Sequence, residues 1–169
     1  MFFKIANVKV SCKVKHLPLD IVKNRLEAFG VVNCYNNYLV LKAKYTYIIF
    51  KTKDKGFPIN HINITKIPNT SLVKEAVSDI ENILGCETFD LVIDNITGSA
   101  KLDKKIDLIQ ITKEKKFDKI KYNNQKFPGL FLKLERGTAI IFHSGKIVIV
   151  GCRKEEDIEC ILQAILAHI

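Results

Sequence analysis

The sequence lacks the features that mark a membrane, secreted or metal-binding protein. No apolar run approaches the roughly 18–20 residues that a helix needs to cross a bilayer. The start, MFFKIANVKV, alternates apolar and polar residues like a strand and has no apolar core of a secretion signal. There is no Cys-x-x-Cys pair and the four histidines are scattered singly, so we expect neither a metal nor a cofactor.

Enzyme signatures are also absent. Four aspartates, Asp90, Asp94, Asp103 and Asp107, could suggest a carboxylate cluster, but no histidine or glycine-rich phosphate loop accompanies them. We therefore expect no catalytic activity. The cysteines are odd in number, and we expect free, mostly buried thiols in an intracellular reducing compartment: Cys12, Cys34, Cys86, Cys152 and Cys160.

What the chain does have is positive charge and enough apolar residues for a core. Its 169 residues are 47% hydrophobic and 27% charged, which is typical of a globular protein of one domain or two small ones. Lysines and arginines outnumber acidic residues, 27 to 18, for a net charge of +9. This charge favours a polyanionic partner, nucleic acid first and a membrane surface second. A basic protein without such a partner is the alternative.

The order of predicted elements occurs twice. In the first half we expect strands at Phe3–Lys13, Tyr38–Leu41, Tyr45–Phe50 and His61–Ile67, a polar loop at Lys51–Asn60, and helices at 18–29 and 70–84. In the second half we expect a strand at Phe89–Leu102, a short helix near Ile106–Ile111, three strands within Phe127–Gly151 and a helix from Lys154.

Equivalent landmarks keep a nearly constant offset. Asn7 and Asn95 are 88 residues apart, and Phe50 and Phe142 are 92 apart. We therefore predict two β-α-β-β-β-α repeats, a degenerate one at 1–86 and a second at 87–169. They would form an α+β fold with one curved antiparallel sheet, helices on one face and the other face bare. An apolar face rimmed by basic residues is typical of a binding surface.

Two segments carry a family resemblance: FPGLFLKLERGTAIIFHSGKIVIVG from Phe127 and FDLVIDNITGSAKL from Phe89. FPGL, F-x-SGK and N-x-x-x-S together resemble the TATA-binding protein family, strongly in the second half and weakly in the first. The resemblance implies a pseudo-twofold saddle whose concave sheet binds and bends A/T-rich double-stranded DNA through the minor groove. It also implies a transcription initiation factor, a platform for preinitiation complex assembly.

The resemblance assigns residues to three roles in DNA binding. Aromatic wedges between base steps fall on Phe50, Phe127, Phe142 and either Tyr35 or Tyr38. The minor-groove floor falls on Asn7, Val8, Thr65, Asn95, Val148 and Val150, the asparagines donating to adenine N3 and thymine O2. Phosphate contacts fall on Lys42 (beside Leu41, which matches Lys133), Lys133, Arg136, Lys146 and Arg153.

The first half departs from the family pattern. The turn after Phe50 is replaced by KTKDKGFPIN, which could supply phosphate contacts, present Phe57 to a partner or be a solvated insertion. Acidic residues that help to hold the B-type initiation factor are missing before Phe127. The implied partners are that factor and the RNA polymerase machinery, and the implied location is the nucleus, or a viral factory or host nucleus. The alternative function is a protein-interaction module with this fold and weakened or lost DNA bending.

Overall fold

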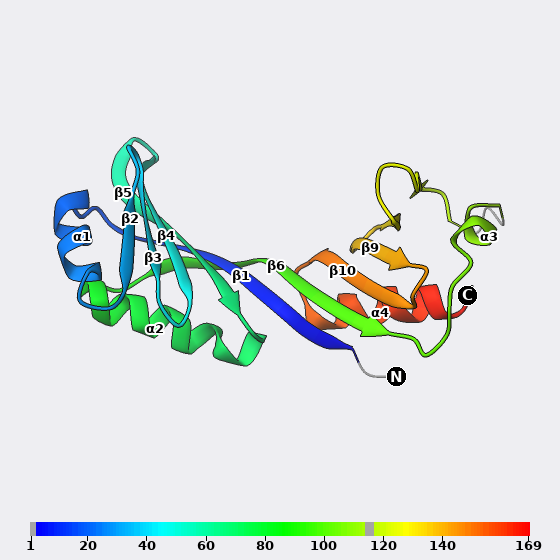
Figure 1. Cartoon of the computed structure of the whole chain (residues 1–169). Helices are drawn as coiled ribbons and strands as arrows, with labels where there is room; N and C mark the ends of the chain where they lie inside the picture. Colours follow the sequence, from blue (N-terminus) through cyan, green and yellow to red (C-terminus); the bar gives the residue numbers. More distant parts are fainter. Residues whose placement is uncertain (1–2, 114–116) are drawn as a thin grey trace. The chain divides into compact units, whose positions relative to one another are not determined.

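The computed structural model describes residues 3–113 and 117–169, which form two compact units. The first unit is Asn7–Asp94, and the second is Asn95–Ile169 together with the residues before Asn7. Figure 1 shows that each unit combines an antiparallel sheet with helices. The predicted repeat boundary between residues 86 and 87 stays a prediction.

The sheet of the first unit has the strand order β2-β3-β4-β5-β1. Its strands are β1 (Lys4–Lys15), β2 (Val31–Cys34), β3 (Tyr38–Lys42), β4 (Thr46–Asp54) and β5 (Phe57–Ile67). Its helices are α1 (Leu19–Leu26), the 3₁₀ turn η1 (Thr70–Leu72) and α2 (Val73–Leu84). Strand β6 (Phe89–Lys101) begins in this unit and continues into the second.

Alternation along the strands places one face of this sheet against the helices. In β1 the side chains of Val8, Val10, Cys12 and Val14 are fully buried, and the residues between them face the other way. Helix α2 buries a stripe at helical spacing, Val73, Ala76, Val77, Ile80 and Leu84. It ends at Gly85, whose φ of 62° is the left-handed conformation that glycine adopts without strain.

The second unit repeats this arrangement with the strand order β6-β10-β9-β8-β7. Its further elements are α3 (Leu108–Lys113), β7 (Ile120–Lys121), β8 (Gly129–Leu134), β9 (Gly137–Phe142), β10 (Lys146–Cys152) and α4 (Glu155–Leu166). Helix α4 buries Ile158, Ile161, Leu162 and Ile165. A Cβ atom on Gly98 would lie 2.8 Å from Ile158, so this glycine lets α4 pack closely on β6.

The predicted helices and main strands are confirmed, with two differences. Each sheet gains a short edge strand that the sequence did not predict, β2 in the first unit and β7 in the second. The predicted polar loop Lys51–Asn60 is wrong, because β4 and β5 continue through it as a hairpin. None of the helices in the described ranges is long and apolar enough to cross a membrane. Within those ranges, no group of three or more His, Cys, Asp and Glu side chains could hold a metal ion.

Candidate nucleic-acid interface

Each sheet has a bare face, which we define as the face opposite to its helices. In the second unit, cross-strand pairs place Ser99, Val148 and Ile140 in one row, because directly paired residues point to the same side. A parallel row joins Val150, Thr138 and Lys133. The predicted residues Lys133, Val148 and Val150 therefore lie on the bare face. Sequence reasoning missed Thr138 and Ile140, although simple alternation from Phe142 would have found them.

Two phenylalanines of the second unit meet at the end of this face. The ring centroids of Phe127 and Phe142 are 5.9 Å apart, and Phe131, which was not predicted, lies 5.1 Å from Phe127. Gly129 pairs with Phe142, and a Cβ atom there would lie 2.6 Å from the Phe127 ring. The missing side chain thus lets Phe127 fold beside Phe142. Phe127 remains 39% exposed, so the pair can contact a ligand.

The equivalent position in the first unit holds a row of aromatic rings. Tyr38 pairs with Phe50 as Gly129 pairs with Phe142, and the two rings are 5.2 Å apart. Tyr35 stacks on Tyr38 at 4.5 Å and is 51% exposed, while His61 lies 6.4 Å from Phe50 on the other side. Both tyrosines that the sequence offered as alternatives therefore join the cluster. Tyr38 fills the space that Gly129 leaves open in the second unit.

The two predicted asparagines have matching roles in the two units. Asn7 Oδ1 accepts a hydrogen bond of 2.8 Å from the Lys66 amide, and Asn95 Oδ1 accepts one of 2.6 Å from the Gly151 amide. Both donor residues have left-handed backbone, with φ of 63° and 83°. Because each side-chain oxygen is already used, the NH₂ group of each asparagine is the part that can bind a ligand. Asn95 Nδ2 also donates a hydrogen bond of 3.2 Å to Thr97 Oγ1, which leaves one of its two N–H groups for a ligand.

The hydrogen bonds of the two asparagines show which predicted floor residues occupy equivalent positions in the two units. Thr65 directly precedes Lys66, and Val150 directly precedes Gly151, so the predicted correspondence of Thr65 with Val150 agrees with the structure. Thr65 pairs with Thr46 of β4, which the sequence analysis did not single out. Thr65 and Val150 are both partly exposed.

Val8 does not belong to the bare face, and its assignment to the groove floor is wrong. Its side chain is fully buried, because neighbours along a strand point to opposite faces and Asn7 is on the bare side. Lys9 takes the exposed place instead, with its Nζ 3.7 Å from Asp94 Oδ2. Asp94 Oδ1 also accepts a hydrogen bond of 3.0 Å from Ser11. The first unit thus has charged groups where an apolar floor residue was predicted.

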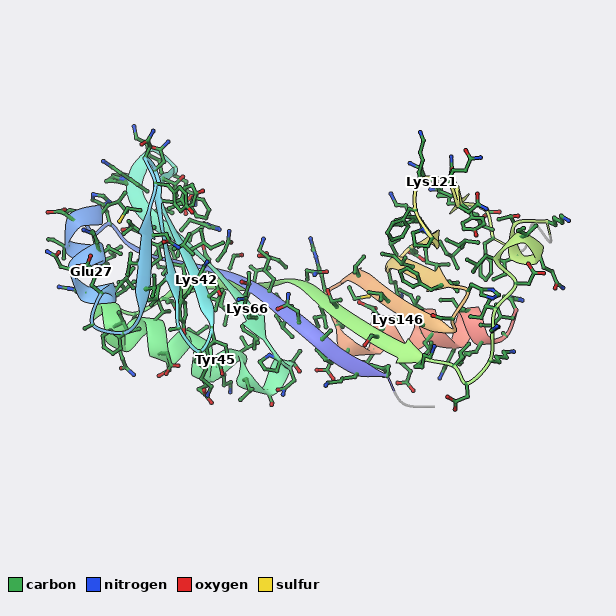
Figure 2. The ribbon with its side chains drawn as sticks, viewed as in Figure 1. Glu27, Lys42, Tyr45, Lys66, Lys121 and Lys146 are labelled. Carbon is green, nitrogen blue, oxygen red and sulfur yellow. The ribbon has the colours of Figure 1, made fainter. Side chains whose placement is uncertain are left out.

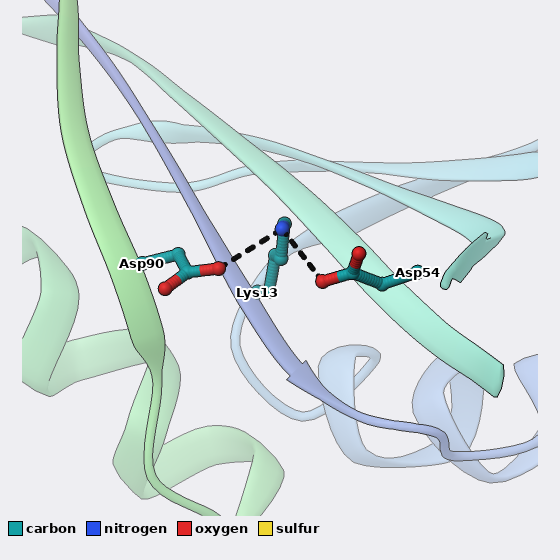
Figure 3. Close-up of polar contacts among 3 residues, drawn as sticks. All are labelled: Lys13, Asp54 and Asp90. Carbon is teal, nitrogen blue, oxygen red and sulfur yellow. Dashed lines mark hydrogen bonds and ion pairs between the residues drawn. The ribbon is translucent and has the colours of Figure 1, made fainter. Parts of the chain in front are cut away.

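A second lysine of β1 is held between two carboxylates (Figure 3). Lys13 Nζ lies 2.8 Å from Asp54 at the end of β4 and 2.9 Å from Asp90 of β6. The hydrogen bond from Lys13 lowers the pKa of Asp54, and the bonds to Asp54 and then Asp90 raise the pKa of Lys13. Lys9 and Lys13 are therefore balanced by three carboxylates. Neither the lysines nor these contacts were predicted, since their partners are far apart in the sequence.

The predicted phosphate-binding residues all have exposed side chains. Lys42 pairs with Thr46 as Lys133 pairs with Thr138, so Lys42 is the counterpart of Lys133, and Leu41 is fully buried. Lys133, Arg136 and Arg153 border a hollow of about 400 Å³ together with Thr138, and the carboxylates of Glu135 and Asp157 also line it.

Two of these cations, Arg136 and Lys146, have charged side chains as neighbours. Arg136 Nη1 is 3.4 Å from Asp157 Oδ1, which offsets part of its charge. Lys146 pairs with Lys101, whose ammonium donates to the Ser144 carbonyl. Figure 2 shows Lys42 and Lys66 in the first unit and Lys146 in the second with exposed side chains.

Comparison with known proteins gives one consistent result. Residues 90–169 match the family described as "Transcription factor TFIID (or TATA-binding protein, TBP)". A TATA-box-binding protein of Methanothermobacter thermautotrophicus is 40% identical over 70 residues, 40% of this chain and 38% of that protein. One of Thermoplasma volcanium is 28% identical over 117 residues, 64% of each chain. The aligned parts thus span only about four tenths to two thirds of these relatives.

A solved structure covers the whole chain. Methanococcus jannaschii TBP superposes with a TM-score of 0.79 at 25% identity, covering 99% of this chain and 97% of that one. The predicted fold class is thereby confirmed: α+β, with antiparallel strands and helices against one face. The match to the family model lies in the second half, where the predicted motifs are strongest.

Proposed function

Because the chain is a divergent member of the TATA-binding protein family, we propose that it binds and bends A/T-rich duplex DNA through the minor groove. In this proposal it is a transcription initiation factor and a platform for preinitiation complex assembly. The observation that carries the proposal is the matched pair Asn7 and Asn95. Each unit uses the oxygen of its asparagine internally and leaves at least one N–H of the NH₂ group available on a bare face, since Asn95 gives only one of its two to Thr97.

The chemistry of the A/T minor groove fits these groups. Its floor offers only acceptors, adenine N3 and thymine O2, so amide donors and small side chains such as Thr65, Val148 and Val150 suit it. Two pairs of aromatic rings would insert between base steps: Phe127 with Phe142 in the second unit, and Tyr38 with Phe50 in the first. Unstacking a step costs a few kcal/mol, which buried apolar surface and phosphate contacts must offset.

The basic residues would then hold the sugar–phosphate backbone. Each neutralised phosphate contributes about −0.9 to the slope of log affinity against log salt concentration, so binding should weaken strongly with salt. The implied partners are a B-type initiation factor and the RNA polymerase machinery, in the nucleus or, for a viral protein, in a viral factory or host nucleus. The protein would act by binding, without catalysis.

A second candidate function is a protein-interaction module that keeps the fold and bends DNA weakly or not at all. Two features of the first unit favour it. Tyr38 fills the position where the second unit has Gly129, and the ion pairs of Lys9 and Lys13 place carboxylates on the bare face. Carboxylates have no hydrogen to donate to the acceptors of an A/T floor, so they disfavour binding there. The second unit has none of these departures, which is why we favour DNA binding.

The test is a double variant, Phe127→Ala with Phe142→Ala, compared with wild type for bending of an A/T duplex. We expect bending to disappear while salt-sensitive, non-specific binding persists, because the phosphate contacts remain. Phe89→Ala is the matched control, since Phe89 is equally exposed at 39% but has no ring contact with either cluster. Unchanged bending in the double variant would show that these rings are not wedges.

A further inference from the structure

The β4–β5 hairpin of the first unit continues well beyond the aromatic row. We call residues Lys51–Asn60 the hairpin extension; it follows the pair Phe50–His61 with four more cross-strand pairs. In the second unit, β9 ends at Phe142 and β10 begins at Lys146, so it has no counterpart. At about 3.3 Å per residue, the extension adds about 13 Å of strand, which is the rise of about four base pairs.

The extension is a regular β-hairpin with fixed contacts to the rest of the sheet. Its two-residue turn, Lys55-Gly56, has φ of 48° and 87°, the left-handed pair of conformations that matches the twist of a tight hairpin. Asp54, beside the turn, is tied to Lys13 of β1, which is tied in turn to Asp90 (Figure 3). These contacts tie the extension to β1 and β6 from a residue close to its turn. A fixed element loses less conformational entropy when it binds a ligand.

The charge of the extension is almost entirely positive. It carries Lys51, Lys53 and Lys55, all exposed, while its one carboxylate, Asp54, is already paired with Lys13. In the described part of the chain, Lys51 and Lys53 have no ion-pair partner. Phe57, next to the turn, is 75% exposed, the most exposed large apolar side chain in the described ranges. Cations beside an exposed aromatic ring match a polyanion that also offers apolar surface.

A hollow lies beside Phe50 on the surface of the hairpin extension. It has a volume of about 340 Å³ and is bordered by Phe50, Lys51, Thr52, Lys53, Ile59 and His61, and by the ion pair of Lys13 with Asp54, in which the carboxylate is neutralised. Ile59 and the rings supply apolar walls for a deoxyribose. Lys51 and Lys53 alternate with Phe50 and Thr52 along β4, so they reach the hollow from its border, where they supply charge for a phosphate. Since Phe50 belongs to both the hollow and the aromatic row, a backbone in the hollow would be continuous with DNA kinked at Phe50.

We propose that the hairpin extension binds the sugar–phosphate backbone of the duplex that flanks the A/T site on the side of the first unit. This inference rests on the proposed DNA binding and deepens it. Because only the first unit has the extension, the flank contacts are one-sided. They favour one of the two orientations in which the protein can lie on a nearly symmetric A/T site. The flanking backbone carries the same charge whatever its bases, so the effect depends on flank length and not on flank sequence.

The experiment compares duplexes with one A/T core and a G/C flank lengthened on the left, on the right or on neither side. Wild-type protein is expected to bind each one-sided duplex several-fold more tightly than the short duplex, because on a nearly symmetric core it can turn its first unit towards the longer flank. The variant Lys51→Gln with Lys53→Gln should lose this gain and about 1.8 of the salt slope, while bending of the core persists. The matched control is Lys74→Gln with Lys105→Gln, which removes two exposed lysines outside the extension.

The outcomes separate this inference from the function on which it rests. Normal bending of the core with no dependence on flank length would overturn the inference and leave DNA bending intact. The same loss in the lysine variant and its control would also overturn it, because a general effect of net charge would then explain the change. Wild-type protein that neither binds nor bends the core would refute both proposals. Thermal unfolding of each variant, expected to match wild type, confirms that only surface charge has changed.

Discussion

Replacing Asn95 by aspartate separates the structural role of this side chain from its proposed role in binding. A carboxylate has the size of the amide and still accepts the hydrogen bond from the Gly151 amide, which is 2.6 Å long in the wild type. It has no NH₂ group, however, so it cannot donate to adenine N3 or thymine O2. The substitution therefore removes the donor and keeps the acceptor.

The expected magnitudes follow from these two contacts. Because the acceptor remains and only the 3.2 Å hydrogen bond to Thr97 is removed, the free energy of unfolding should stay within about 1 kcal/mol of wild type. A carboxylate opposite a base acceptor loses a hydrogen bond and leaves polar groups unpaired, which costs about 1–3 kcal/mol of binding free energy, or roughly 5–150-fold in affinity. Asn7→Asp should do the same in the first unit, where the oxygen accepts from the Lys66 amide.

The assay is a fluorescence anisotropy titration of a labelled A/T duplex, with thermal unfolding measured on the same samples. Asn123→Asp is the matched control, since Asn123 Oδ1 also accepts a backbone amide, that of Gln125, in the loop between β7 and β8, and no contact with the groove floor is assigned to this residue. Unchanged affinity of Asn95→Asp for the A/T duplex would refute the donor role. A large loss of stability with the control unaffected would refute the reasoning about the retained acceptor.

Three further predictions concern the aromatic cluster and the thiols. Gly129→Ala places a methyl group 2.6 Å from Phe127 and 2.8 Å from Ile140, so it should cost about 1–3 kcal/mol of stability and displace the Phe127 ring. Bending should fall with it, and a variant that bends as wild type would contradict the packing role of Gly129. Among the thiols, exposed Cys34 and Cys160 should react with Ellman's reagent in the folded protein, while Cys12 and Cys152 react only on unfolding. Burial raises the pKa of Cys12 to about 12 and that of Cys152 to about 11, above the ordinary value of 9.0. Their contribution to the free energy of unfolding is therefore full below pH 9 and decreases as the pH rises towards 11–12. Chemical denaturation of wild type and Cys12→Ala at pH 8 and pH 10 measures this decrease. Equal pH dependence of stability in the two proteins would contradict the prediction.

Local pattern was enough to predict most of the fold. Alternation in β1 and the helical stripe of α2 follow directly from which residues must be buried. The edge strands β2 and β7 were missed because they are short and depend on pairing with β3 and β8 rather than on their own pattern. The hairpin extension was taken for a loop because lysines and Pro58 disfavour strands. There the turn at Gly56 and the tether of Asp54 to Lys13 prevail over local propensity.

The candidate site could be predicted only where it depends on residue type and spacing. The offset between Asn7 and Asn95 found two residues whose side-chain oxygens have the same role. Val8 was misassigned although alternation alone excludes it from the face of Asn7. The carboxylates that pair with Lys9 and Lys13 come from β4 and β6, so only the folded chain reveals that they share this surface.

Bending of DNA is the central claim, and FRET between dyes at the two ends of a short duplex measures it most directly. Wild-type protein would be titrated into a duplex with a TATA-like centre and into a G/C-rich control, each at two salt concentrations. We predict a large rise in energy transfer on the A/T duplex only, with binding that weakens as salt increases. Salt-sensitive binding to both duplexes with no rise in energy transfer on either would contradict the proposal, because it would leave a basic surface that binds DNA without bending it.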